Sequence, residues 1–244
     1  MKNLFYLTIA SILVFSCNKP VEKISKTWLD QPIDFYQIQE VVNTYHMFDS
    51  TDTKVGSMIF GFSFEDGFLV ARDTSQFDDG SVYETAEFTL DTSSFKMKKL
   101  AIDMKTAQAS IDIDLNQTDK ITGTYILSRD TLSNEYPIDS AYQHDVIRGE
   151  LYMLFYTLQL KENDSISFKV LAPTSMAISE ASLSHEGTEK IETAAGSFQC
   201  DVLWLKSDGI MPSNKIWISK SEPRKVVKFY VPGPEFAIEL VSSK

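Results

Sequence analysis

The chain has few of the residue types from which local catalytic and metal sites are built. Of its 244 residues, two are cysteine and three are histidine. His46, His144 and His185 lie far apart and form neither an HxH nor an HExxH spacing. The GxSxG turn of serine hydrolases and the GxxxxGK[ST] phosphate loop are also absent. No stretch of sequence therefore identifies a reaction. We expect no cofactor and no metal, with the histidines at the surface or rim of the fold.

The scarcity of cysteine also argues against a disulfide-stabilised domain. If Cys17 is modified, Cys200 has no partner left in the chain. Alternation along 197–205 places Cys200 on one strand face with Phe198, Val202 and Trp204. Free cysteine is among the most buried residue types. We expect Cys200 to be a reduced, buried, structural thiol that is dispensable for any activity.

Long apolar runs are absent except near the start, where residues 4–15 are apolar apart from two hydroxyl residues. This run is shorter than the roughly 20 residues that span a bilayer, and it follows Lys2, as in a secretory signal. Val14-Phe15-Ser16-Cys17 resembles the lipobox of bacterial lipoproteins, although Phe15 is bulkier than usual. The resemblance implies a diacylglyceryl thioether and an acylated amine on Cys17, whose several acyl chains would anchor it durably.

These features divide the chain into three parts. Residues 1–16 are expected to be a lipoprotein signal peptide, 17–30 a lipidated polar tether, and 31–244 a single β-rich domain. No acidic cluster follows Cys17, which favours anchoring in the outer membrane, facing the periplasm.

Positive charge is in deficit, with 23 Lys and Arg against 34 Asp and Glu, a net charge of −11. Such a surface repels nucleic acid and anionic lipid headgroups. Apart from the membrane reached through Cys17, the expected partners are neutral, hydrophobic or cationic: a small hydrophobic molecule or an envelope protein.

The body of the chain repeats a pattern of short apolar alternation followed by a turn. The clearest case runs from Ala107 to Leu115, where apolar residues alternate with polar ones such as Asp112 and Asp114. We expect these two aspartates on a solvated face rather than at a cation site. Turns at 65–67 and 78–80 carry glycine. Such spacing predicts a mainly β fold, an antiparallel barrel or half-barrel meander. Strands are expected at 41–48, 56–64, from 68, 82–90, 107–115, 121–127, 165–171, 176–184, 190–193, 197–205, 215–218, 226–231 and 236–241.

One segment departs from this pattern of alternation and turns. Between 139 and 158 apolar residues recur at close to helical spacing, and Asp139 or Ser140 can cap the first turn. We expect one helix over about 139–158, packed across an open side or mouth of the barrel. Residues 34–48 fit a helix in part, but the strand propensity of 41–48 is the stronger signal.

The chain holds 16 Phe, 10 Tyr and 3 Trp, enough to fill a β core or to line a hollow one. The sequence leaves both open. The residues expected to face the apolar interior are Ile59, Phe62, Ile111, Ile113, Phe198, Val202, Trp204, Trp217 and Phe229.

The second half resembles the bacterial family called domain of unknown function 3108. The likeness is carried by Asp145-Val146-Ile147-Arg148, by 190–200, by Ile216-Trp217-Ile218-Ser219 and by Glu222-Pro223-Arg224 within 45–241. It implies a single barrel-like domain with a helix, in an exported and often lipid-anchored protein, and it lends no active site. The fold is also similar to half-barrel lipoproteins that shield acyl chains, which is an analogy of fold only.

The leading hypothesis is a non-enzymatic, lipid-anchored envelope protein that binds a hydrophobic ligand or a partner protein. One alternative is an envelope hydrolase whose site assembles only in space. The other is a structural or assembly factor that uses a sheet edge or the acidic face.

Overall fold

The computed structural model describes residues 25–27, 38–209, 211–233 and 235–244. The first half contains β1 (Ser25–Thr27), β2 (Val41–Phe48), β3 (Lys54–Glu65), β4 (Phe68–Phe77), β5 (Val82–Asp91), β6 (Met97–Thr106), β7 (Ser110–Gln117), β8 (Ile121–Arg129) and β9 (Leu132–Ser140). The second half contains β10 (Val146–Ile147), α1 (Arg148–Thr157), β11 (Ser165–Ala172), β12 (Ala177–Thr193), β13 (Gly196–Ser207), β14 (Asn214–Ser219), β15 (Val226–Val231) and β16 (Phe236–Ser243).

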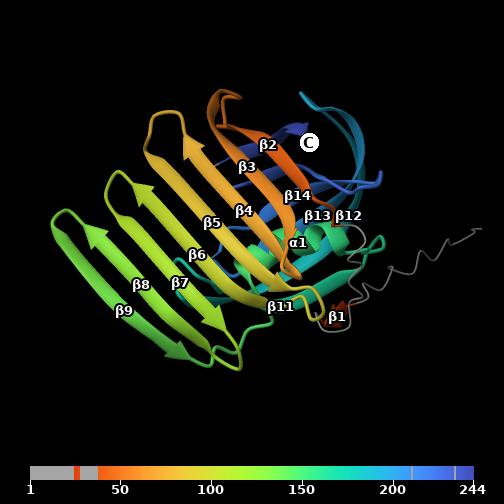
Figure 1. The fold of residues 1–244 in the computed structure, drawn as a ribbon. Coiled ribbons are helices and arrows are strands. Elements are labelled where there is room, and N and C mark those ends of the chain that lie inside the picture. The colour runs from red at the N-terminus through yellow and green to blue at the C-terminus, as the bar shows by residue number, and fades with distance from the viewer. Residues whose placement is uncertain (1–24, 28–37, 210, 234) are drawn as a thin grey trace, which may run out of the picture.

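All of these strands belong to one 16-stranded sheet. Two meanders, β2 to β9 and β11 to β16, are joined by antiparallel pairing of β16 with β2. The short strands β1 and β10 pair with β11 in parallel, and β1 and β9 end the sheet without meeting. In Figure 1, β4 to β9 extend as a broad sheet while β11 to β14 curl around α1. The expected antiparallel half-barrel with one packed helix is confirmed, in its open form.

Turn chemistry accounts for the tightest hairpin. Asp66 and Gly67 connect β3 to β4 with φ of 50° and 84°, and Glu65 pairs with Phe68. Two successive positive φ angles are typical of a type I′ turn, whose twist matches that of the strands. The Asp-Gly pair therefore fixes the register of this hairpin.

Besides the short strands β1 and β10, two longer strands escaped the sequence pattern. In β6, Lys98 and Lys99 are both exposed because the register shifts beside them, and this bulge interrupts the period of two. In β9 almost every residue is exposed, so no apolar face exists to be recognised. Pro137 within β9 is typical of an edge strand.

The helix is shorter than expected because its first half is not helical. Residues 139 and 140 still belong to β9, and Val146 and Ile147 form β10. The predicted caps are wrong: Ile147 is the N-cap, and its N–H donates to Glu150 Oε2 at 2.6 Å. The other oxygen of Glu150 accepts the Met97 N–H at 2.5 Å, which ties α1 to β6.

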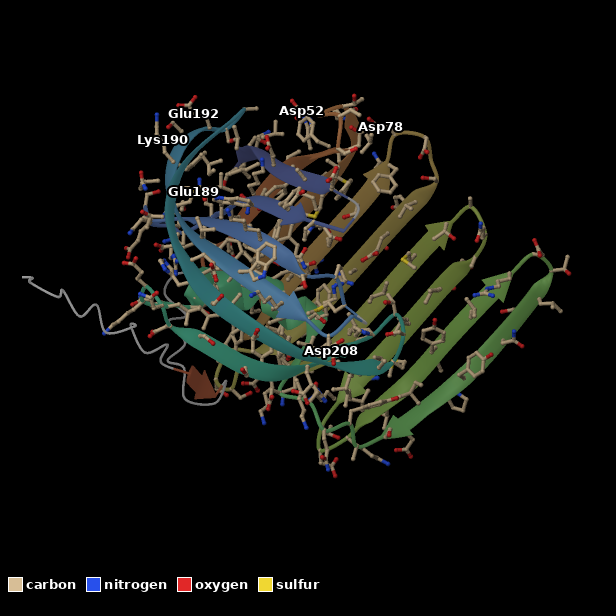
Figure 2. All side chains as sticks on the ribbon, turned by 180° about the vertical axis from the view of Figure 1, so that it is seen from behind. Asp52, Asp78, Glu189, Lys190, Glu192 and Asp208 are labelled. Atoms are coloured by element: carbon tan, nitrogen blue, oxygen red, sulfur yellow. The ribbon has the colours of Figure 1, made fainter. Side chains whose placement is uncertain are left out.

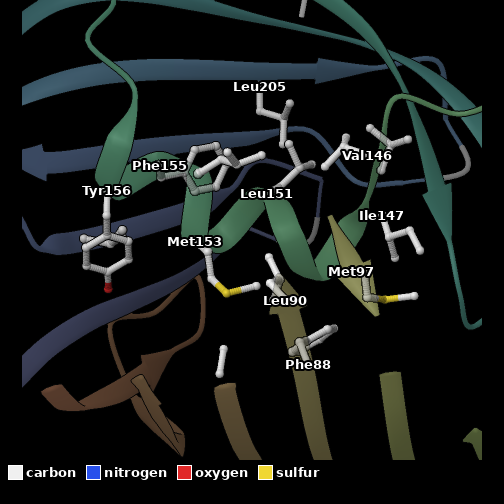
Figure 3. Packing of buried hydrophobic residues seen from close by; sticks show 14 of the residues in the cluster. Phe88, Leu90, Met97, Val146, Ile147, Leu151, Met153, Phe155, Tyr156 and Leu205 are labelled. Atoms are coloured by element: carbon white, nitrogen blue, oxygen red, sulfur yellow. The ribbon is translucent and has the colours of Figure 1, made fainter. Parts of the chain in front are cut away.

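Helix α1 lies inside the curl of the sheet and is buried on nearly all sides. Leu151 and Phe155 point toward Leu205, whereas Met153 points toward Leu90 of β5 (Figure 3). A helix that is apolar all round is typical of a protein interior. Gly149 allows α1 to approach Phe88 closely, because a Cβ atom at position 149 would lie 1.8 Å from Cε1 of Phe88. Within the described residues no helix is long and apolar enough to cross a membrane.

A second, smaller apolar cluster lies on the opposite face of β13 to β15. Cys200, Val202, Trp217 and Val227 form it, and the Trp217 indole N–H donates to Glu189 at 2.7 Å. The C-terminal part of the sheet therefore has apolar clusters on both faces. This explains why the residues on its outer face are also apolar in the sequence.

Candidate binding cavity

The concave face of the sheet encloses a cavity of about 390 Å³. Strands β2 to β6 form one wall, β14 to β16 another, and the start of α1 closes it between them. Most of its lining is apolar, including Met47, Met58, Phe60, Phe88, Phe229 and Ile238. Cavities of about 300–1,000 Å³ with a few polar groups are typical of small-molecule sites.

Strand alternation explains which side chains reach this cavity. On β4, Leu69 and Ala71 are fully buried on the concave face, and Asp73 follows two residues later on the same face. On β5, Glu84 precedes Ala86 and Phe88 in the same way. On each of the two strands, a carboxylate thus stands at one end of a row of apolar side chains on the concave face. Both carboxylates line the cavity.

Arg148, the first residue of α1, adds a positive charge to the same cavity. Tyr152, one turn further along α1, has the largest influence on Arg148 and raises its pKa, and the charge of Glu84 acts in the same direction. The guanidinium is therefore held in its charged form.

The two carboxyls titrate abnormally because they are removed from water. Burial, together with the nearby charge of Glu84, raises the pKa of Asp73 to about 7, although a hydrogen bond from the Ser75 hydroxyl opposes the shift. Burial also raises the pKa of Glu84, against the lowering effect of Arg148. The Ser75 hydroxyl lies 3.0 Å from Asp73 Oδ2. At neutral pH, Asp73 is therefore close to half protonated.

Asp73, Glu84 and Arg148 have no ion-pair partner within 4.0 Å among the described residues. On the outer face of the same strands, by contrast, Arg72 pairs with Glu65 at 2.7 Å and with Glu87 at 2.8 Å. These surface charges thus form close ion pairs, whereas the charges of the cavity act on one another only over longer distances.

The family model for "Protein of unknown function (DUF3108)" matches residues 36–240, which include every residue that lines the cavity. The chain belongs to this family. No curated protein matches it.

Three solved structures resemble this DUF3108 chain. A beta-barrel-like protein of domain of unknown function DUF1849 from Brucella abortus has a TM-score of 0.51 at 8% identity, covering 84% of this chain and 97% of the other. A candidate lipoprotein from Parabacteroides distasonis scores 0.31 at 12% identity, covering 85% and 96%. A candidate exported protein with a YmcC-like fold from Bacteroides fragilis scores 0.36 at 10% identity, covering 85% and 96%. The first likeness supports the barrel-like fold of the DUF3108 chain and says nothing of a ligand.

The residues expected in the apolar interior are divided between the two faces of the sheet. Phe229 lines the cavity. Phe62 and Ile113 are buried in the main core, with Ile111 packed against it.

The interior assignment is wrong for four of the nine. Ile59 is 47% exposed on the outer face, since residues three apart on a strand, such as Ile59 and Phe62, cannot face the same way. Val202 and Trp217 belong to the outer cluster, and Trp204 follows Val202 on that face. Phe198 packs against both clusters.

The other predicted positions have mixed outcomes. Cys17 lies outside the described residues. Cys200 is free and fully buried as expected, and burial raises the pKa of its thiol to about 12. Asp112 and Asp114 are exposed as expected. His185 is not at the surface: it is 8% exposed, with Nε2 3.1 Å from Asp201 Oδ1.

The polar residues of the cavity were missed by sequence reasoning. Asp73 and Glu84 sit at positions where the alternation calls for an apolar residue, and this mismatch was the available signal. No group of three or more His, Cys, Asp or Glu able to hold a metal ion occurs in the part of the chain that the structure describes.

Proposed function

We propose that this protein is a lipid-anchored component of the bacterial envelope that binds a small hydrophobic molecule in its concave cavity, without transforming it. The observation that carries the proposal is the cavity of about 390 Å³ with its mainly apolar lining. Binding would remove a ligand's apolar surface from water, which is the dominant driving force for such association.

The anchor is proposed from the sequence of the first residues. Val14 to Cys17 supplies the lipobox-like segment, and the acylated Cys17 would hold the domain at the outer membrane, facing the periplasm. Acidic side chains lie around the edge of the domain, among them Asp52, Asp78, Glu189 and Glu192 (Figure 2). Because the chain carries a net charge of −11, the domain would stay off anionic lipid headgroups and remain accessible to ligands in solution.

The test is to express residues 18–244 without lipid and titrate them with N-phenyl-1-naphthylamine, a neutral apolar fluorophore. Saturable binding is expected. Ala86→Phe, which fills the cavity from β5, should weaken binding at least tenfold, because Ala86 is buried and lines the cavity. Ala101→Phe, a matched change on the outer face of β6, should leave binding unchanged. Absence of saturable binding to the wild type would refute the proposed function.

A second candidate, hydrolysis, is favoured by one feature. Asp73, whose pKa is raised to about 7, lies near a second carboxylate in a cavity, and such pairs can supply an acid and a base. The described lining offers them neither a histidine nor a cysteine. If the wild type hydrolysed ester or glycoside substrates and Asp73→Asn abolished this turnover, the function would be catalysis rather than binding.

A further inference from the structure

The charged residues of the cavity occupy one defined part of its wall. Glu84 lies opposite Ser75 in the register of β4 and β5, and Asp73 lies opposite Ala86. Asp73 and Glu84 are therefore diagonal neighbours on one face, whose Cβ atoms are typically about 7 Å apart. Arg148 reaches the same region from α1. The charged groups occupy one part of the cavity and most of the remaining lining is apolar, as an amphiphile requires.

The charges in this region do not balance. Arg148 and Glu84 influence each other, whereas Arg148 has no resolved influence on Asp73. The ionisable groups that line the cavity from all its elements are Asp73, Glu84, Arg148 and the tyrosines Tyr45, Tyr152 and Tyr156. No lysine is among them. With both carboxylates ionised, Glu84 is offset by Arg148 and one negative charge, that of Asp73, is left uncompensated.

A buried carboxylate without a counter-charge is costly, and the site can lower that cost in two ways. Without a ligand, Asp73 can take up a proton. With a ligand, a cation beside Asp73 can supply the missing charge and donate hydrogen bonds to its carboxylate. An anionic head group would instead face two carboxylates, and the one arginine is already engaged by Tyr152 and Glu84.

We propose that the cavity selects amphiphiles with a single cationic amine head group, with the ammonium beside Asp73 and the apolar tail along Phe60, Phe229 and Ile238. This inference rests on the proposed binding function and specifies its ligand class.

The experiment compares three head groups on one tail. Dodecylamine, dodecanol and dodecanoate, below their micellar concentrations at pH 8, compete with N-phenyl-1-naphthylamine for residues 18–244. Dodecylamine is expected to displace the fluorophore at a concentration at least tenfold lower than either of the others. Asp73→Asn should remove this preference, so that dodecylamine and dodecanol displace the fluorophore at similar concentrations. Asp112→Asn, an exposed position on β7, is the matched control and should retain the preference.

A pH series on the wild type tests the same inference without a variant. Because the cation needs Asp73 ionised, and the pKa of Asp73 is about 7, affinity for dodecylamine should fall about tenfold from pH 8 to pH 6. Affinity for dodecanol should stay constant over this range.

The outcomes separate the two proposals. If the fluorophore does not bind, the binding function itself fails. If it binds but dodecanoate competes as well as or better than dodecylamine, or if the affinity for dodecylamine does not change between pH 8 and pH 6, the amine specificity is overturned and the binding function stands.

Discussion

Two small residues show how single positions are constrained here. Gly149, the second residue of α1, lies against the ring of Phe88, and Cys200 is buried in the outer cluster with Trp217. A Cβ at position 149 would overlap Phe88, so the effect of a substitution there is set by packing rather than by conformational preference.

Gly149→Ala should therefore destabilise the protein, although alanine is normally the better helix former by about 1 kcal/mol. The new Cβ would overlap Phe88, and overpacking of this kind costs about 1–3 kcal/mol. Urea denaturation of Gly149→Ala, of Phe88→Leu and of the double variant measures this cost. The double variant should be less destabilised than the sum of the two single ones. Strict additivity would show that the contact is not the cause.

The thiol of Cys200 should react slowly in the native protein. It is fully buried, and its pKa of about 12 leaves almost no thiolate at pH 8. Labelling with a maleimide is expected to be at least tenfold slower in buffer than in 6 M urea. Fast native labelling, or loss of ligand binding in Cys200→Ala, would contradict a structural role.

At the scale of elements, strands with an apolar face were predictable and others were not. The bounds of β2 and β15 were predicted to the residue, and β2 alternates between buried and more exposed positions along most of its length. Strand β12 was divided in two because a bulge between His185 and Gly187 interrupts its period. Strand β9 was missed because it buries almost nothing. The cavity itself could not be predicted, since periodicity gives the face of each residue but not the space between facing walls.

One buried carboxylate ties the start of α1 to the sheet. Glu150 is 5% exposed and accepts backbone N–H groups from both Ile147 and Met97. Glu150→Gln leaves only one acceptor oxygen, so one buried donor loses its partner at a cost of about 1–3 kcal/mol. Chemical denaturation should show this loss at pH 8, and Glu135→Gln on exposed β9 should show none. Equal stability of the two variants would mean that the helix is held by packing alone.

For the whole molecule, buried carboxyls predict greater stability in mild acid. Burial raises the pKa of both Asp73 and Glu150 to about 7, above their values in the unfolded chain. The native state therefore binds more protons between about pH 4 and pH 7, so stability falls as pH rises through this window. The two groups together contribute on the order of several kcal/mol. Repulsion within a chain of net charge −11 acts in the same direction.

Urea denaturation at pH 5 and pH 8 measures this dependence, with the higher midpoint expected at pH 5. The double variant Asp73→Asn, Glu150→Gln should show a much smaller difference, whereas Asp112→Asn should behave as the wild type. A midpoint that rises from pH 5 to pH 8 would show that neither carboxyl is buried in the way described.

The proposed lipid anchor is also tested on the whole chain. Cys17→Ser should abolish acylation, and the protein should move from the detergent phase to the aqueous phase in a partitioning experiment. Metabolic labelling with a clickable fatty acid measures acylation directly. Label incorporated at wild-type levels by the Ser variant would place the modification elsewhere.

The pairing of β16 with β2 has a consequence for the order of events in folding. Lys244 exchanges backbone hydrogen bonds with Val42 at 2.9 and 3.0 Å, so β16 joins the two meanders to each other. Contacts between segments this distant in sequence form slowly, because the long loop between them must close first. Since the cavity takes its walls from both meanders, its shape is complete only after β16 has paired with β2.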